Sequence, residues 1–231
     1  MFLEHQPYQP YHDLSSAVTG MPVNVFSYGI VAYDAALGIL RSAVNDRIKN
    51  RIPDTLLLLE HPPTYTLGIR GKMEHLLVST ADLKSRNIDI HHTDRGGDIT
   101  FHGPGQLVGY PVLDLKSRHL DIRQYVKKLE TLMIRSIADF GITAHRIHGF
   151  PGVWADNRKI AAIGVKINAH GISSHGFAVN VNTDLSFFKH IIPCGLADAE
   201  MTSLAEITGH PVEMDRVKRS VAAAFLSEFD R

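Results

Sequence analysis

A chain of 231 residues with 44% hydrophobic and 21% charged side chains has the composition of a soluble globular protein, and it is long enough to bury a core without disulfide bonds. Lysine and arginine together number 24, as do aspartate and glutamate, so there is no overall positive field to hold nucleic acid, although a local basic patch could still steer a carrier protein with an acidic surface. The single cysteine, Cys194, excludes an internal disulfide, and no signal peptide or membrane-spanning apolar run is found, so we expect a cytoplasmic protein without membrane contact.

The pattern of the chain changes near residue 22. Residues 1–21 are polar, aromatic and proline-containing without a period, and they are expected to form an N-terminal extension. Residues 22–231 show helix and strand patterns with no internal repeat, low-complexity tract or linker, and they are expected to fold as a single domain.

The first half of this domain begins with a short strand pattern at residues 23–28. Apolar residues then recur every three or four positions over residues 30–48, which predicts an amphipathic helix. The continuous apolar run at residues 55–59, stopped by His61 and two prolines, predicts a buried strand. The next segments predict one short helix and three strands, at residues 81–87, 88–92, 99–102 and 107–115.

Two helices and a strand-rich block complete the chain. Asp121 is a candidate N-cap for a helix that ends before Gly141, and a last helix begins near residue 215. Between them, residues 152–182 are rich in strand patterns, most clearly at residues 159–167. The inner faces of the two helices are expected to carry Ile122, Val126, Leu129, Met133, Ile137 and Phe140, and Val217, Val221, Phe225 and Phe229. Because helices and strands do not alternate regularly, we expect an α+β fold, a mixed sheet with packed helices.

The densest run of glycines lies at residues 95–106, with the sequence RGGDITFHGPGQ. Four glycines let the backbone approach a ligand closely, and Arg95 and His102 can donate hydrogen bonds to an anion or a carbonyl. The same glycines are equally typical of a tight loop between two strands. The segment is neither a phosphate-binding loop nor a dinucleotide fingerprint, because no Gly-Lys-Ser/Thr follows and no helix begins there.

Cys194 stands between proline and glycine in an expected loop, a common place for reactive groups. A thiol is a strong nucleophile only as the thiolate, which needs a nearby cation, base or helix N-terminus; a buried structural cysteine is the alternative. Lys159 and Lys166 flank a nearly apolar strand. Their numbers differ by an odd value, so in a regular strand they point to opposite faces, and only one is expected to share a site with Cys194.

Fourteen histidines raise the question of a metal site. The chain has no HExxH or CxxC spacing, so we expect neither a metal nor another cofactor. Most of the histidines are expected at the surface or, with their hydrogen bonds made, in the core.

Taken together in order, six segments resemble the lipoyl(octanoyl) transferase family over roughly residues 23 to 229. They are EHPPTYTLG at 60–68, the glycine-rich segment running on through Val108 and Tyr110, KIAAIG at 159–164, HGFAVN at 175–180, PCG at 193–195 and MTSL at 201–204. The resemblance implies the fold of the biotin and lipoate protein ligase catalytic domains, and it makes residues 22–231 an octanoyltransferase catalytic domain.

The resemblance also implies substrates and site residues. The donor would be octanoyl-acyl carrier protein, and the acceptors would be the apo lipoyl domains of oxo-acid dehydrogenase complexes and the glycine cleavage H protein. Cys194 matches the acyl-thioester nucleophile of the family, and Lys159, not Lys166, matches its paired lysine. The residues that match stretches lining the acyl site are Arg95, Gly96, Gly97, Asp98, Ile99, Thr100, Phe101, His102, Ala162, Ile163, Gly164, Gly176, Phe177 and Ala178.

The implied activity is transfer of an octanoyl group to a lysine through a cysteine thioester, the first step of endogenous protein lipoylation. A thioester donor is already activated, so no ATP is needed. His102 is expected to orient groups or line the pocket rather than act as the base. Two rival readings stay open: an ATP-dependent lipoate or biotin protein ligase of the same fold, and a non-catalytic module that binds lipoyl domains. A requirement for ATP would indicate the ligase, and turnover above one acyl group per chain would exclude the binding module.

Overall fold

The computed structural model describes residues 12–13, 23–192 and 200–229. Within them, eight strands form one sheet in the order β1-β2-β3-β7-β11-β10-β9-β8, in which only β2 and β3 run parallel. The strands are β1 (His12–Asp13), β2 (Val23–Ile30), β3 (Asp54–Glu60), β7 (Gln106–Val112), β8 (His145–Ile147), β9 (Phe150–Ala155), β10 (Arg158–Ile167) and β11 (Ser173–Asn180). This mixed sheet with packed helices confirms the α+β class.

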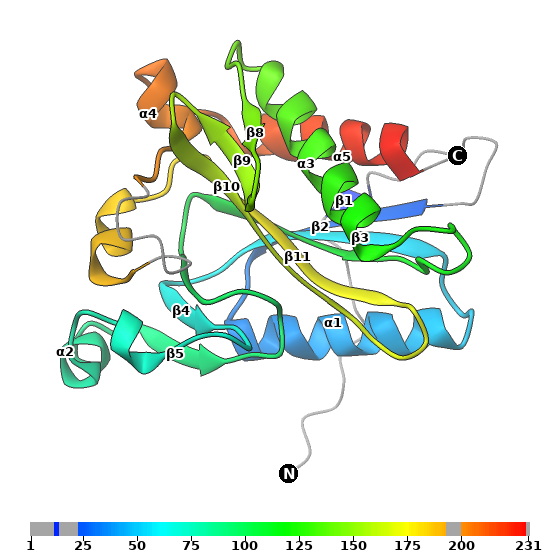
Figure 1. The fold of residues 1–231 in the computed structure, drawn as a ribbon, viewed down its shortest axis with the longest axis horizontal. Helices are drawn as coiled ribbons and strands as arrows, with labels where there is room; N and C mark the ends of the chain where they lie inside the picture. The colour runs from blue at the N-terminus through cyan, green and yellow to red at the C-terminus, as the bar shows by residue number, and fades with distance from the viewer. Residues whose placement is uncertain (1–11, 14–22, 193–199, 230–231) are drawn as a thin grey trace.

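Helices cover both faces of this sheet, which forms the middle layer of the molecule (Figure 1). On one face α1 (Tyr33–Ile48) buries Leu40 against the sheet, and on the other α3 (Ile122–Ala138) and α5 (Met214–Phe229) pack side by side over a larger core. No helix in the described part of the chain has the length and apolar character needed to span a membrane.

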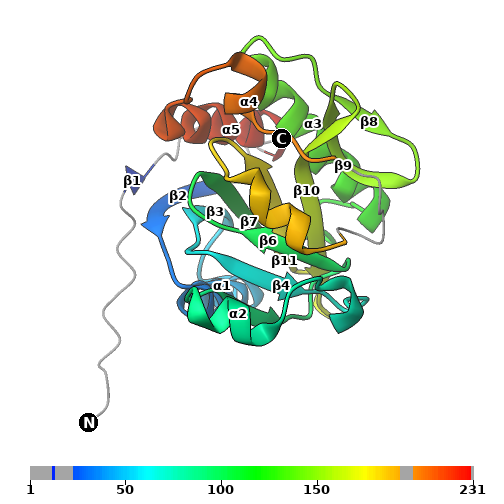
Figure 2. The ribbon, with the colours of Figure 1, turned by 90° about the vertical axis from the view of Figure 1, so that its left-hand side faces the viewer.

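A second sheet lies on the same side of the main sheet as α1 (Figure 2). In the described residues it has three strands in the order β5-β4-β6, with β4 (Thr64–Leu67), β5 (Asp89–His92) and β6 (Ile99–His102). Its own apolar core holds side chains from α2 (Thr80–Ser85) and the 3₁₀ helix η2 (Leu185–His190). The other short helices in the described part of the chain are η1 (Met73–His75) and α4 (Leu204–Thr208).

The predicted helices and strands are largely present, with shifted ends. The helix predicted from residue 30 begins at Tyr33 instead, because Ile30 pairs with Glu60 and extends β2 along β3. The helix after Asp121 is confirmed, but Ile122 is 53% exposed and so does not lie on its inner face. The strands β4 and β8 were not predicted, although β5 and β6, which are as short as β4, were.

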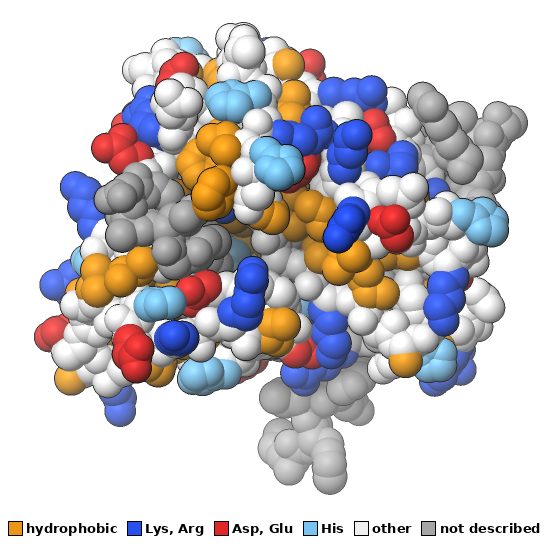
Figure 3. Space-filling view, in the orientation of Figure 1, with side chains coloured by type: hydrophobic (Ala, Val, Ile, Leu, Met, Phe, Trp, Pro, Cys, Tyr) orange, Lys and Arg blue, Asp and Glu red, His pale blue; other side chains and the backbone are white. Residues whose placement is uncertain are grey.

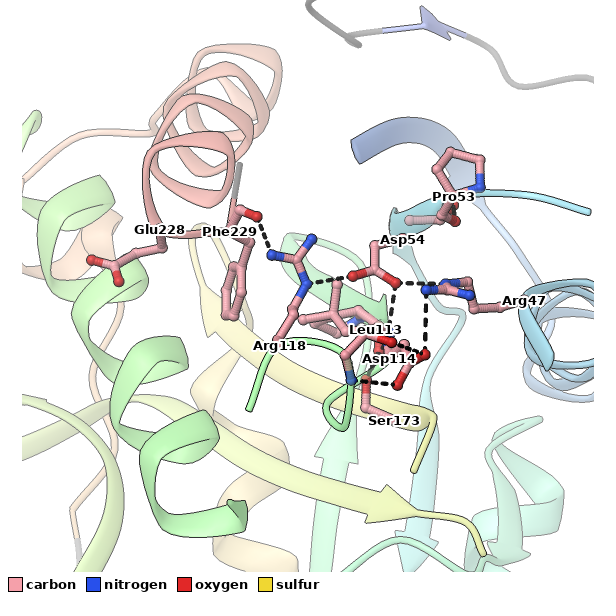
Figure 4. Close-up of polar contacts among 12 residues, drawn as sticks. Arg47, Pro53, Asp54, Leu113, Asp114, Arg118, Ser173, Glu228 and Phe229 are labelled. Carbon is pink, nitrogen blue, oxygen red and sulfur yellow. Dashed lines mark hydrogen bonds and ion pairs between the residues drawn. The ribbon is translucent and has the colours of Figure 1, made fainter. Parts of the chain in front are cut away.

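A buried ion cluster ties together elements from four parts of the chain (Figure 4). The Asp54 carboxylate, at the start of β3, accepts from Arg47 Nε at 2.7 Å and from Arg118 Nε. It also accepts from the backbone N–H of Asp114 at 2.9 Å, and Arg118 donates to the carbonyl of Phe229 at the end of α5. Because Asp54 is only 3% exposed, removing either arginine would leave its buried carboxylate without one of its two ion-pair partners and destabilise the fold.

Candidate functional site

A cavity opens between the β10–β11 hairpin and the glycine-rich segment that carries β6. Its volume is about 50 Å³. All the residues assigned to the acyl site from sequence line it except Gly96 and Phe101. Phe101 instead stacks on Phe187, with ring centroids 4.4 Å apart, in the core of the small sheet. The cavity is also lined by Tyr33, Val108, Tyr110 and His175.

The glycines of this site let its walls approach each other closely. A Cβ on Gly176 would lie 2.1 Å from the carbonyl oxygen of Gly109 on β7, and one on Gly164 would lie 2.9 Å from the carbonyl oxygen of Gly96. Gly97 has a φ of +97°, in the left-handed region that favours glycine. Any larger residue at Gly176 or Gly164 would therefore push the strand and the loop apart before it reached a ligand.

Arg95 fastens the glycine-rich segment to the small sheet. Its guanidinium is buried and donates to Thr66, to the hydroxyl at 2.9 Å and to the carbonyl at 2.7 Å. It also donates to the carbonyl of Asp98, in its own loop, at 2.8 Å. The sequence had suggested donation to an anion or a carbonyl, and these bonds are to carbonyls and a hydroxyl.

A chain of hydrogen bonds connects His102 with the strand of Lys159. The Gln106 side-chain amide donates to Asn180 Oδ1 at 3.0 Å, so its oxygen is the acceptor for His102 Nδ1 at 2.7 Å. Asn180 then donates to the carbonyl of Thr202 at 3.0 Å, and the Thr202 N–H donates to the carbonyl of Lys159 at 3.0 Å. His102 therefore carries its proton on Nδ1, which leaves Nε2 as an acceptor.

Burial keeps the histidines beside the cavity neutral. Desolvation lowers the pKa of His102 well below its usual value, which opposes a role as proton acceptor near neutral pH. His61, whose ring centroid lies 5.6 Å from that of His102, donates from Nδ1 to the carbonyl of Val31 and accepts from the Tyr110 hydroxyl at 2.9 Å. Burial lowers the pKa of His61 to about 4. Among the described residues, no group of three histidine, cysteine, aspartate or glutamate side chains is placed to hold a metal ion.

A polar cluster lies beside the cavity and includes its lining residue His175. Asp94 accepts from His175 Nε2 at 2.8 Å and from the ammonium of Lys166. Burial would raise the pKa of Asp94, but these two hydrogen bonds outweigh it and lower the pKa to about 2. His61 and Tyr110 belong to segments of the family resemblance, but nothing in their spacing showed that they would meet, and nothing pointed to Asp94.

Lys159 is buried, and an irregularity in β10 decides which way it points. Lys159 pairs with Trp154 whereas Ala161 pairs with Val153, so β10 carries an extra residue at this point, a β-bulge. Val153 and Ala155 point into the core under α3 and α5, so Trp154 and its partner Lys159 point to the other face.

Lys166 lies on the same face of β10 as Lys159. Past the bulge, Ala161, Ile163, Val165 and Ile167 pack on the core under α3 and α5, and Ala162 and Gly164 line the cavity on the other side. Lys166 follows the alternation of these last two. The prediction that the two lysines point to opposite faces is therefore wrong, because the bulge cancels the odd spacing. They differ in burial, since Lys159 is 5% exposed and the Lys166 side chain 42%.

The ammonium of Lys159 lies over the Trp154 ring, 5.5 Å from its centroid, a cation–π contact. Its backbone N–H donates to the carbonyl of Glu200 at 2.8 Å, and Met201 forms a parallel bridge with it. Cys194 lies outside the described residues. Directly before residues 193–199, the backbone N–H of Ile192 donates to the carbonyl of His75. The His75 ring is hydrogen-bonded to the Asp98 carboxylate at 2.6 Å.

Comparison with known proteins identifies the family. The model of the lipoyl protein ligase A/B catalytic domain matches residues 32–226. The octanoyltransferase of Pelobacter propionicus is 46% identical over 202 residues, covering 87% of this chain and 93% of that protein. The octanoyltransferase of Chloroflexus aggregans is 43% identical over 210 residues, covering 90% of this chain and 95% of that protein.

The chain belongs to the octanoyltransferase family. It is an acyltransferase, and the resemblance seen in the sequence is confirmed.

Solved structures place the octanoyltransferase fold among the lipoate protein ligases. Lipoate-protein ligase A bound with ATP superposes with a TM-score of 0.67 at 16% identity, covering 89% of this chain and 84% of that chain. A bipartite lipoate protein ligase from Thermoplasma acidophilum, solved in a study with its E2 lipoyl domain, gives a TM-score of 0.64 at 15% identity, covering 87% and 83%. At this identity the likeness shows the shared fold alone.

Proposed function

We propose that this acyltransferase moves an octanoyl group from the thioester of an acyl carrier protein to a lysine of an apo lipoyl domain, through a thioester on Cys194. The acceptors would be the lipoyl domains of oxo-acid dehydrogenase complexes and the glycine cleavage H protein, and residues 22–231 would form the catalytic domain. The observation that carries the proposal is the position of Lys159. It is buried on β10, the strand that carries the cavity residues Ala162 and Gly164, and its backbone bonds Glu200 and Thr202, at the described end of the segment that contains Cys194.

In the first half-reaction the Cys194 thiol gives its proton to Lys159 and attacks the thioester carbonyl. The tetrahedral oxyanion collapses, the bond to the carrier sulfur breaks, and the Lys159 ammonium protonates the departing thiol. Two features support this role for Lys159. The Trp154 ring lies 5.5 Å from its ammonium, and Gly152 gives its chain the space it occupies, because a Cβ there would lie 2.7 Å from Lys159 Cε.

In the second half-reaction the acceptor lysine attacks the acyl-enzyme as the neutral amine. Neutral Lys159 takes the proton that this amine loses, and the Cys194 thiolate leaves. The amide product is more stable than the thioester, so the step runs downhill without ATP. The acceptor class is supported by the lipoate protein ligase from T. acidophilum, a protein of this fold studied with its E2 lipoyl domain.

The cavity supports an acyl chain as the group transferred. Its inner wall is formed by small or apolar side chains, Ala162, Ala178 and Val108, and His102 Nδ1 and the Tyr110 hydroxyl are engaged with Gln106 and His61. A fatty acyl tail needs such a surface and makes no hydrogen bonds.

The deciding experiment is intact-mass measurement after the protein is mixed with octanoyl-acyl carrier protein without ATP. We expect one octanoyl group on the wild type and none on Cys194→Ala, and in separate samples either hydroxylamine or an apo lipoyl domain should release it. An adduct that persists in Cys194→Ala would overturn the nucleophile. Transfer that requires ATP and free octanoate would instead indicate a ligase, and a single acyl group per chain without release would indicate a binding module.

A further inference from the structure

A groove separate from the cavity runs between α3 and the β8–β9 hairpin. It contains about 1220 Å³ of space not filled by atoms and is open to solvent along its length. The first turns of α3 form one wall, and the tip of the hairpin, around Gly149, forms the other.

Large apolar side chains line this groove and remain exposed. Ile122 is 53% exposed and Phe150 is 41% exposed, and Val126 and Pro151 lie between the same walls. Single exposed apolar side chains are ordinary, but several facing one groove mark a surface that binds another molecule. The exposure of Ile122, which breaks the inward pattern of α3, is explained if the groove is covered in a complex.

The charges around the groove are mainly positive. Among the described residues that line it, the cations are Arg123, Lys127 and Arg146, and the one carboxylate is Glu130, which pairs with Arg146 at 2.8 Å. The whole chain has a formal net charge of zero, so this is a local excess. The space-filling view shows Lys and Arg side chains beside hydrophobic ones on the face where α3 and the hairpin lie (Figure 3).

The groove lies next to Lys159. Glu130, which lines the groove, accepts a hydrogen bond from the backbone of Gly152 at 3.2 Å. Gly152 in turn packs against the side chain of Lys159. Strand β9 thus leads directly from Phe150 in the groove to Trp154 over the lysine.

We propose that this groove docks the acyl-donor protein, an acidic protein that presents an apolar side chain flanked by carboxylates and carries its acyl thioester on a flexible arm. The proposal rests on the proposed function. The basic rim and apolar floor complement such a partner, and opposite charges speed its association. One wall of the groove is α3, whereas the cavity lies on the side of the small sheet, so a donor bound in the groove needs an arm to bring its thioester to the cavity. An acceptor lysine, with only its own side chain for reach, must approach over the cavity itself.

The test compares charge reversal in the groove with the same reversal elsewhere. Arg123→Glu combined with Lys127→Glu changes two exposed positions on α3. Lys49→Glu combined with Lys84→Glu changes two exposed positions away from the groove, one directly after α1 and one on α2. Each variant is assayed with octanoyl-acyl carrier protein and with octanoyl-pantetheine, which has the thioester but no protein. Binding of the carrier without its acyl group is measured by calorimetry.

We expect the groove variant to raise KM for octanoyl-acyl carrier protein and weaken carrier binding about 10-fold or more, with kcat and the rate with octanoyl-pantetheine within about twofold of wild type. The control variant should match wild type with both donors. Phe150→Ser should weaken carrier binding without changing its salt dependence. These results support the proposal.

Four results would overturn the docking proposal. Unchanged carrier binding in the groove variant would show that the donor docks elsewhere. A raised KM for the lipoyl domain alone would assign the groove to the acceptor, and a wild-type dimer that the variant dissociates in sedimentation would assign it to a second copy of the chain.

If wild type forms no acyl-enzyme with either donor, the proposed function fails and the docking proposal fails with it. Acylation by both donors with unchanged carrier binding refutes docking alone.

Discussion

At the scale of single residues, the two lysines of β10 differ in surroundings rather than in the face they occupy. They are seven positions apart, roughly 20 Å along a strand, so their ammonium groups cannot serve one site. Lys159 is buried against Trp154, and Lys166 is held at the surface by Asp94. A surface pair of this kind contributes little to stability.

We therefore expect Lys159→Ala to lower the rate of transfer by about 100-fold or more, the size typical of losing a general acid–base, and Lys166→Ala to change it by less than about threefold. Lys159→Arg keeps a positive charge near the thiol but cannot give up its proton near neutral pH. It should still form the acyl-enzyme slowly but fail to turn over. Single-turnover and steady-state rates with octanoyl-acyl carrier protein measure both steps, and equal losses at the two lysines would refute this division of roles.

Asn180 links the cavity to the strand of Lys159, because its amide accepts from Gln106 and donates to the Thr202 carbonyl. In Asn180→Asp a carboxylate oxygen replaces the amide donor and faces that carbonyl. The hydrogen bond to Thr202, in the segment after the cysteine, is therefore lost. We expect kcat to fall more than about 10-fold with KM nearly unchanged. Asn182→Asp is the matched control, since Asn182 bonds Val212 instead. A similar fall in both variants would show only a general loss of stability.

At the scale of elements, long patterns were predictable and short ones were not. Helix α5 and strand β3 were predicted from apolar periodicity or a continuous apolar run, and Val217, Val221 and Phe225 are buried as expected. The bulge in β10 was not predictable, because it exists only relative to the register of β9. For the same reason the sequence could name segments of the site but not which side chains would share a face.

Helix α3 owes its defined start to a capping box. The Asp121 carboxylate accepts from the Gln124 N–H at 2.8 Å, and the Gln124 side chain accepts from the Asp121 N–H at 3.0 Å. Asp121→Ala should lower the free energy of unfolding by about 1 kcal/mol and Tm by about 2–4 °C. Asp121→Asn, which can still accept, should stay within a few tenths of a kcal/mol. Thermal unfolding followed by circular dichroism compares them, and equal losses in the two variants would contradict the capping explanation.

At the scale of the whole molecule, the site draws on positions from Tyr33 to Thr202. The cavity forms where the small sheet meets β10 and β11, so its residues meet only through long-range strand pairing. Composition and periodicity contain no information on that pairing, which is why the family resemblance, and not spacing, identified most of the lining residues. The residues that resemblance left without a role, His61, Tyr110 and His175, are buried polar groups whose partners lie far away in sequence.

Those buried groups make the fold sensitive to acid. The pKa of His61 is about 4 in the folded chain, below its usual value of 6.5, so between these pH values the unfolded chain binds more protons. Stability should therefore fall as pH is lowered from 6.5 toward 4, by about 2 kcal/mol between pH 7 and pH 5 from this group alone. The lowered pKa of His102 and of His175 acts in the same direction.

Urea unfolding at pH 7 and pH 5 measures this loss, and His61→Gln tests its source. The variant should be less stable at pH 7, because it loses the bond to Tyr110, yet its stability should decline less between the two pH values, because the titrating group is gone. His170→Gln, at an exposed position, should keep the wild-type decline. The stabilising effect of Asp94, whose pKa is about 2, is complete above pH 3.8 and is lost only below it, so it does not enter this window. A decline in His61→Gln as steep as that of the wild type would place the acid-sensitive group elsewhere, with His102 the next residue to replace.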